Sequence, residues 1–174
     1  RFNSPKSNMI LYEKGNILIN KIHREKKNGI DITDRTKKQS IPDLWEYYLK
    51  IENNTSIFIT ELDIYLNYRR SCYDEFTKSK NKKNILFISI PEQTKKFQLR
   101  NRRDGDRIVL ETGTKKIKEL MIEKKLDTFT KKSVPIIVID GEIAAYLPGI
   151  IGSYPNRVSC NFWVNDNTKN MFIF

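Results

Sequence analysis

Short apolar runs separated by polar turns recur along most of the chain, a pattern that is typical of β-strands. The clearest pair is Ile136–Ile139 and Glu142–Leu147, because the Asp140-Gly141 step between them favours a two-residue hairpin turn. The continuous apolar run Ile85–Ile90 predicts a strand buried on both faces, ended by Pro91. Further strands are predicted at Met9–Tyr12, Asn16–Ile19, Ile64–Arg69, Arg157–Val164 and Asn170–Phe174.

The segment Ile41–Ile51 fits both a helical face and strand alternation. A turn at Asn53–Thr55 and a second alternating run, Ser56–Thr60, follow it, which favours a hairpin of two strands. Two charged segments, Arg24–Gln39 and Thr77–Asn84, are predicted to be solvated loops.

One main helix is predicted over Thr114–Leu126, with Thr114 as its N-cap. An inward stripe is expected at Ile117, Leu120, Met121 and the aliphatic stem of Lys124.

Lys115 and Lys116 are unusual in the first turn of that predicted helix. Cations there oppose the helix dipole, at about 0.3–1 kcal/mol each. Free N–H groups and two lysines would together make a phosphate site. The alternative is that exposed lysines are simply tolerated in salt.

These elements indicate an α+β fold, a β-sandwich-like body with one main helix. No internal repeat or low-complexity linker divides the chain. We expect a β-rich connecting part over residues 1–90 and a C-terminal domain over residues 91–174, which together also fit one continuous domain.

Composition adds a charge argument. The net charge of +11 and the pI near 9.6 fit a polyanionic partner. AT-rich coding also produces a sequence rich in Lys, Asn and Ile. The positions of the charges are therefore better evidence for a polyanionic partner than the total charge is. The chain begins at Arg1 without a methionine, and we expect it to be a piece of a longer protein.

The two cysteines, Cys72 and Cys160, lack metal-ligand spacing and are expected to be reduced thiols. His23, the only histidine, lies among charged residues and is expected at the surface. No run reaches the roughly 18 apolar residues of a membrane span, and the first segment lacks the apolar region of a signal peptide. We therefore expect a soluble, cytoplasmic protein.

The stretch Lys96–Ile108 carries the densest candidate chemistry. Asp104-Gly105 marks a tight turn that should fan Arg100, Arg102, Arg103 and Arg107 outwards. Arginine suits bidentate phosphate contacts. The alternative is a solvated turn whose aspartates pair with the neighbouring arginines.

Catalytic chemistry is missing from the sequence. An enzyme needs a nucleophile with a base, a metal cluster or a phosphate-cradling glycine loop. The chain has no Gly-rich loop followed by Lys-Ser/Thr, no Ser-Gly-Gly-x-Asp-Ser motif and no carboxylate dyad.

The order of motifs resembles the C-terminal domain of tRNA(Ile)-lysidine synthetase. The first matching piece is the stretch Lys96–Ile108, called the arginine turn below. The others are Gly113 followed by Lys115-Lys116-Ile117-Lys118, the run Val134–Ile143, and Leu147-Pro148-Gly149. The resemblance covers about Phe97 to Gly149, and as a combination it is specific. It implies a three-layer arrangement shared with a substrate-side domain of the phenylalanyl-tRNA synthetase β chain.

The resemblance also implies a function. The family's enzyme uses ATP, with magnesium, to adenylate the wobble cytidine of a minor isoleucine tRNA, and lysine then displaces AMP. Its catalytic domain carries the Ser-Gly-Gly motif, so this chain is expected to need no cofactor itself and to hold the tRNA, by its acceptor stem. Implied partners are isoleucine tRNA and the catalytic N-terminal domain of the same chain, with a homodimer left open and no membrane.

Seven residues are the predicted tRNA contacts: Arg100, Arg102, Arg103, Arg107, Lys115, Lys116 and Lys118. The sequence departs from the family pattern at Asp104 and Asp127, where proline is usual, at Lys131, where arginine is usual, and at Tyr146, where tryptophan is common. Two other classes remain open: a generic basic RNA-binding module and an interaction domain that docks an acidic protein surface.

Overall fold

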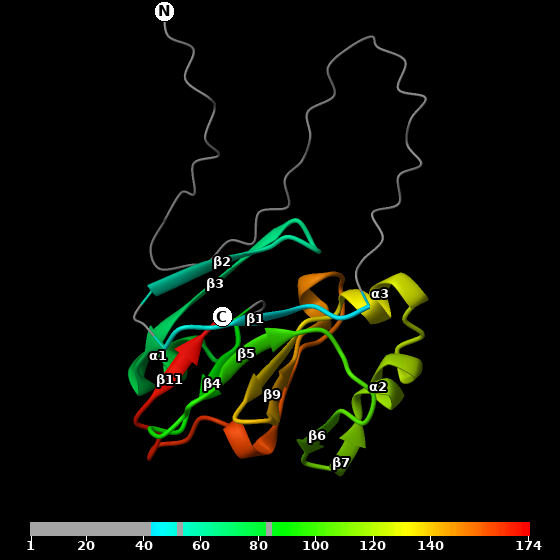
Figure 1. The fold of residues 1–174 in the computed structure, drawn as a ribbon. Coiled ribbons are helices and arrows are strands. Elements are labelled where there is room, and N and C mark those ends of the chain that lie inside the picture. Colours follow the sequence, from blue (N-terminus) through cyan, green and yellow to red (C-terminus); the bar gives the residue numbers. More distant parts are fainter. Residues whose placement is uncertain (1–42, 52–53, 83–84) are drawn as a thin grey trace, which may run out of the picture.

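The computed structural model describes residues 43–51, 54–82 and 85–174, and these ranges form three layers (Figure 1). The first layer is a four-stranded sheet, and the middle layer is a five-stranded sheet. The third contains a two-stranded hairpin and two short helices. The predicted mixed, mostly β architecture in layers is confirmed.

The first sheet has the order β2 (Asn54–Ile59), β3 (Ile64–Ser71), β11 (Met171–Ile173), β4 (Phe87–Ser89). The middle sheet has the order β1 (Glu46–Tyr48), β5 (Phe97–Arg100), β8 (Ile136–Ile139), β9 (Glu142–Tyr146), β10 (Arg157–Val158). The third layer holds β6 (Arg107–Leu110), β7 (Gly113–Lys116), α2 (Ile117–Glu123) and α3 (Thr128–Ser133). The remaining helices are α1 (Tyr73–Ser79) and the 3-10 turns Pro148–Ile150 and Cys160–Phe162.

The middle sheet is apolar on both faces because it separates two cores. Successive strand residues point to opposite faces. Ile137 and Ile139 therefore pack with the first sheet, whereas Ile136 and Val138 pack with the third layer. This explains why β8 reads as an uninterrupted apolar run, each side chain of which contributes about 1.5–3 kcal/mol on burial.

The β8–β9 hairpin confirms the strongest prediction from the sequence. Asp140 and Gly141 both have positive φ, 47° and 92°, as the two-residue turn requires. The Asp140 carboxylate also accepts hydrogen bonds from the backbone N–H groups of Lys95 (3.0 Å) and Lys96 (2.7 Å). The turn thus anchors the start of β5, the strand that leads into the arginine turn.

The predicted hairpin between 41–51 and 56–60 is wrong, although both segments contain strands. β1 pairs with β5, with Tyr47 opposite Leu99, and β2 pairs with β3. Trp45 and Leu49, on either side of β1, are 5% and 6% exposed in the core between the two sheets. Burial of these two large side chains over β5 outweighs the local hairpin preference.

The predicted helix 114–126 begins three residues late. Gly113 (φ 103°) turns the chain, so Thr114, Lys115 and Lys116 pair with β6 as strand β7. α2 then starts at Ile117, and the Glu119 carboxylate accepts the Lys116 backbone N–H (3.3 Å). Lys115 and Lys116 therefore lie on β7, before the first helical turn in which they were predicted.

The inward stripe of α2 is confirmed at its three apolar positions. Ile117, Leu120 and Met121 are buried, whereas Lys124 is exposed. α3 follows closely and adds a second short helix to this layer.

Two further predictions need correction. Residues 77–79 of the expected loop 77–84 belong to α1. The helix is held by Phe76, whose ring centroid lies 5.3 Å from that of Phe87 on β4. The predicted strand Arg157–Val164 is a strand only over Arg157–Val158, where β10 pairs with β9, and it continues into the 3-10 turn Cys160–Phe162. The predicted strand at the C-terminal end is β11, which lies between β3 and β4. Here too, long-range apolar burial selected the partners.

Other predictions are not tested. Those at 9–12, 16–19, 24–39 and His23 lie outside the described residues. The division into parts 1–90 and 91–174 stays a prediction, and β1 from the first part pairs with β5 from the second. Cys72 and Cys160 are free, as expected.

Candidate nucleic-acid interface

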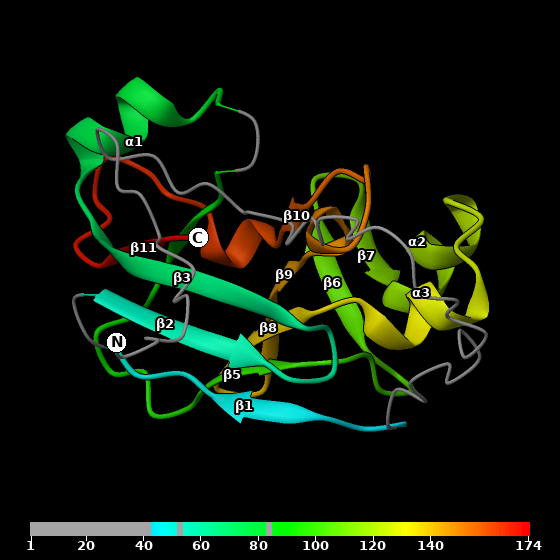
Figure 2. The same ribbon diagram turned by 90° about the horizontal axis from the view of Figure 1, so that it is seen from above.

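The arginine turn joins β5 to β6, at the boundary between the middle sheet and the third layer (Figure 2). The chain reverses over Arg103–Asp106, where the Asp106 N–H donates to the Arg103 carbonyl (3.3 Å). Gly105 has φ 89°, a conformation that side chains disfavour. The predicted glycine-dependent turn is thus confirmed.

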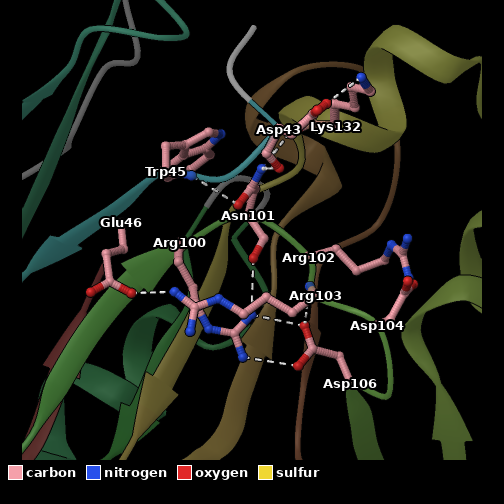
Figure 3. A network of polar contacts seen from close by, with 10 residues as sticks. All are labelled: Asp43, Trp45, Glu46, Arg100, Asn101, Arg102, Arg103, Asp104, Asp106 and Lys132. Atoms are coloured by element: carbon pink, nitrogen blue, oxygen red, sulfur yellow. Dashed lines mark hydrogen bonds and ion pairs between the residues drawn. The ribbon is translucent and has the colours of Figure 1, made fainter.

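Arg100 points inwards, which corrects the expectation that all four arginines fan outwards. Its guanidinium donates twice to the Asp106 carboxylate (2.8 and 2.9 Å), and the two side chains are 8% and 11% exposed (Figure 3). Strand alternation places Arg100 on the face that the third layer covers, where a charge requires a partner. Asp106 also accepts the Arg103 backbone N–H (2.7 Å), so this pair shapes the turn from inside.

Asn101 is the second internal support of the turn. It is 1% exposed, and its Oδ1 accepts the Trp45 backbone N–H (3.2 Å). Its Nδ2 donates to the carbonyls of Asp43 (2.9 Å) and Lys132 (3.4 Å). One side chain thereby joins the arginine turn, the entry to β1 and the end of α3.

Arg102 and Arg103 lie on the outer side of the turn and point in opposite directions (Figure 3). Arg102 pairs with Asp104 (2.7 Å), whose side chain is 93% exposed. Arg103 pairs with Glu46 of β1, and its hydrogen bond lowers the pKa of that carboxyl. Exposed pairs of this kind contribute little to stability because water competes for both charges, so their cations can readily exchange partners.

A cleft of about 620 Å³ opens between the arginine turn, α2, α3 and the residues before β1. Its lining carries two carboxylates, Asp43 and Asp104, against five cationic side chains, a formal balance of +3. The cations are Arg102, Arg103, Lys118, Lys131 and Lys132.

The cleft gathers three of the seven predicted contacts and adds two lysines that the sequence argument missed. Lys131 and Lys132 lie in the last turn of α3, a helix that the pattern did not predict. The Lys132 Nζ donates to the Asp43 carboxylate (2.5 Å), which lowers the pKa of that carboxyl. The signal that could have revealed α3 is Asp127, its N-cap, whose Oδ1 accepts the Thr130 N–H (3.0 Å).

The other predicted contacts lie elsewhere. Arg107 and Lys116 face each other across the β6–β7 ladder, and both are exposed. Lys115 pairs with Glu123 of α2 (3.1 Å). None of these three lines the cleft, and Arg100 is buried.

Two departures from the family pattern have structural consequences. Asp127 replaces a usual proline and caps α3, and its hydrogen bonds with Thr130 lower the pKa of its carboxyl. Tyr146 replaces a common tryptophan and is 2% exposed, and burial raises its pKa to about 12. Both residues therefore support the layer that carries the cleft.

The described ranges contain no group of three or more His, Cys, Asp or Glu side chains that could hold a metal ion. In the same ranges, every helix is too short to cross a bilayer.

Residues 97–153, from the start of β5 to just past the Pro148–Ile150 turn, match the family model described as "TilS substrate C-terminal domain". This third of the chain is similar to the TilS substrate C-terminal domain. This confirms the resemblance that the arginine turn and the motifs after it predicted.

Relatives and a solved structure agree with the TilS assignment. The chain is 41% identical over 58 residues to a tRNA(Ile)-lysidine synthase of Thermotoga maritima, covering 33% of this chain and 14% of that protein. It is 28% identical over 144 residues to one of Clostridioides difficile, covering 83% of this chain and 29% of that protein. The chain thus spans less than a third of either relative.

The structure titled "Crystal structure of TILS C-terminal domain" has the same fold. It superposes with a TM-score of 0.52 at 21% identity, covering 74% of this chain and 94% of that one. The TilS match includes the whole arginine turn and Lys118, whereas Asp43 and Leu44, which also line the cleft, lie outside it.

Proposed function

We propose that this chain is the tRNA-binding portion of a tRNA(Ile)-lysidine synthase, the ligase that joins lysine to the wobble cytidine of a minor isoleucine tRNA. The TilS match and the names of the relatives support the enzyme class. ATP, magnesium and lysine would be used by a catalytic domain of the parent protein. The part described here would position the RNA.

The observation that carries the RNA-binding role is that five cationic residues line one cleft. Lys131 and Lys132 come from α3, Lys118 from α2, and Arg102 and Arg103 from the turn. Three separate elements supply charges of one sign, and buried hydrogen bonds of Arg100 and Asn101 hold the turn that presents two of them. A preorganised basic surface of this kind suits backbone phosphates.

The proposed target within the tRNA is the acceptor stem. Duplex RNA hides its base edges in a deep, narrow groove, so proteins read it mainly through shape and phosphates. Such a contact lets one domain hold the RNA at a distance from the reacting base while another domain performs the chemistry.

The first test measures the salt dependence of tRNA binding by the 1–174 chain. If about four phosphates are engaged, log K should fall with log salt at a slope of roughly −3, taking about −0.9 per contact by analogy with duplex DNA. Arg103→Ala should flatten the slope by about one unit. Arg157→Ala, at the opposite edge strand of the middle sheet, is the matched control and should leave it unchanged.

The second test compares RNA fragments. An acceptor-stem hairpin should bind nearly as well as whole tRNA, and an anticodon hairpin should not. Equal binding of the anticodon hairpin would contradict the acceptor-stem assignment. Binding that ignores salt would instead favour the alternative, an interaction domain for an acidic protein surface.

A further inference from the structure

The basic cleft also contains exposed apolar side chains, which phosphate binding does not explain. Leu44, just before β1, is 63% exposed, and Ile122, on α2, is 54% exposed. Both line the cleft, with the buried Met121 beside Ile122. Single exposed apolar residues are ordinary on a protein surface. Here, two from segments distant in the sequence line one cleft together with five cationic residues.

The size of the cleft restricts its occupant. About 620 Å³ lies within the roughly 300–1,000 Å³ typical of sites for small ligands. One or two nucleotides fit such a volume, whereas a duplex can only lie across its rim. Apolar walls among cations match a nucleotide, whose base is largely apolar on its faces and whose phosphate is anionic.

We propose that this cleft binds unpaired nucleotides at the end of an RNA stem, with bases against Leu44 and Ile122 and phosphates at the surrounding cations. This rests on the proposed RNA-binding function and adds a second mode of contact to it. Unpaired bases can turn out of a stack and pack on protein side chains, which bases within a duplex cannot do.

The cationic residues of the cleft can bind the phosphates of such an unpaired RNA segment. Arg102 comes from the turn, Lys118 from α2 and Lys131 from α3, and all three line the same cleft as the two apolar side chains. The carboxylate of Asp104, 93% exposed, is bound only to Arg102 among the described contacts, and a phosphate can replace it there. The stem itself would stay on the outer surface of the arginine turn.

The test uses three labelled RNAs that share one stem and differ at its end: blunt, extended by about four unpaired nucleotides, and extended by the same number of abasic residues. Fluorescence anisotropy with the 1–174 chain measures each affinity. We expect the base-bearing extension to bind about fivefold tighter than the abasic one, the order given by removing a few tens of Å² of apolar surface from water. The abasic extension keeps its phosphates, so the comparison isolates the bases.

Variants locate the effect. Ile122→Gln and Leu44→Gln should each reduce the advantage of the base-bearing extension without changing blunt-stem affinity. Tyr65→Gln is the control, because Tyr65 on β3 is also 54% exposed and lies in the first sheet. Thermal unfolding of each variant checks that the fold is retained.

Equal affinity for the base-bearing and abasic extensions would overturn the proposal. So would an advantage of the base-bearing extension that survives both cleft variants. Displacement of the extended RNA by an acidic, leucine-containing peptide at equal concentration would also overturn it, in favour of a protein ligand. If the blunt stem binds with the expected salt dependence and the extension adds nothing, only this inference fails. If no RNA binds, the proposed function fails as well.

Discussion

The inner and outer halves of the arginine turn contain the same residue types and have opposite roles. Arg100 and Asp106, on the inner side, are 8% and 11% exposed and make a bidentate pair. Arg102 and Asp104, on the outer side, are 25% and 93% exposed and share a single 2.7 Å contact. The inner pair maintains the turn, and the outer cations are available to a ligand.

Burial explains the difference. Removing one partner of a buried pair leaves an uncompensated charge away from water, which destabilises the protein strongly. An exposed pair has water as an alternative partner for both charges and contributes little. An arginine-rich motif therefore cannot be treated as a uniform binding surface.

The largest effect is expected from breaking the inner half. Asp106→Ala leaves the Arg100 guanidinium buried without its carboxylate and removes the acceptor of the Arg103 N–H. We expect a loss of about 3–5 kcal/mol in the free energy of unfolding, measured by urea denaturation. Asp104→Ala is the matched control and should change stability by less than about 1 kcal/mol. Similar losses in both variants would remove the distinction between the halves.

The next effect concerns Asn101, whose side chain satisfies one buried N–H and reaches two carbonyls. Asn101→Ala should cost about 1–3 kcal/mol, because the Trp45 N–H loses its acceptor. The urea midpoint measures this change. Weaker RNA binding with an unaltered midpoint would instead make Asn101 a direct RNA contact.

A smaller effect, on RNA affinity rather than on stability, is expected from a change in the outer half of the arginine turn. Asp104→Asn removes a negative charge beside Arg102, and a phosphate about 4 Å away would gain about 1 kcal/mol in water, roughly fivefold in affinity. Anisotropy with tRNA at low salt measures this gain. Asp166→Asn, another exposed aspartate, is the control. An unchanged or lower affinity of Asp104→Asn would mean that phosphates do not approach Arg102.

The smallest effect is a pH dependence of stability from Glu46, whose pKa in the folded protein is lowered from 4.5 by Arg103. The Glu46 carboxyl binds a proton less tightly in the folded state than in the unfolded state. Its ionised form therefore stabilises the folded protein above about pH 4.5, and this contribution is lost as the pH falls through the lowered pKa. The stability difference between wild type and Glu46→Gln should therefore shrink between pH 7 and pH 3. A difference that stays constant over this range would show that Glu46 and Arg103 do not interact in solution.

Local sequence determined the turns and the family. Asp140-Gly141 and Gly105 adopt the positive φ values that the sequence predicts, because a turn depends on a few adjacent residues. The motifs between Phe97 and Gly149 predicted the similarity to the TilS substrate C-terminal domain for a similar reason, because their order and spacing can be read directly from the sequence.

Tertiary structure alone decided which charges the protein exposes. The sequence does not show that Arg100 is enclosed, that β1 pairs with β5, or that Lys131 and Leu44 line the same cleft. Strand partners are chosen by burial between segments far apart in the chain, as for Trp45 and Leu49 over β5. The burial of a charge follows from that choice, so the basic cleft could be recognised only from the assembled layers.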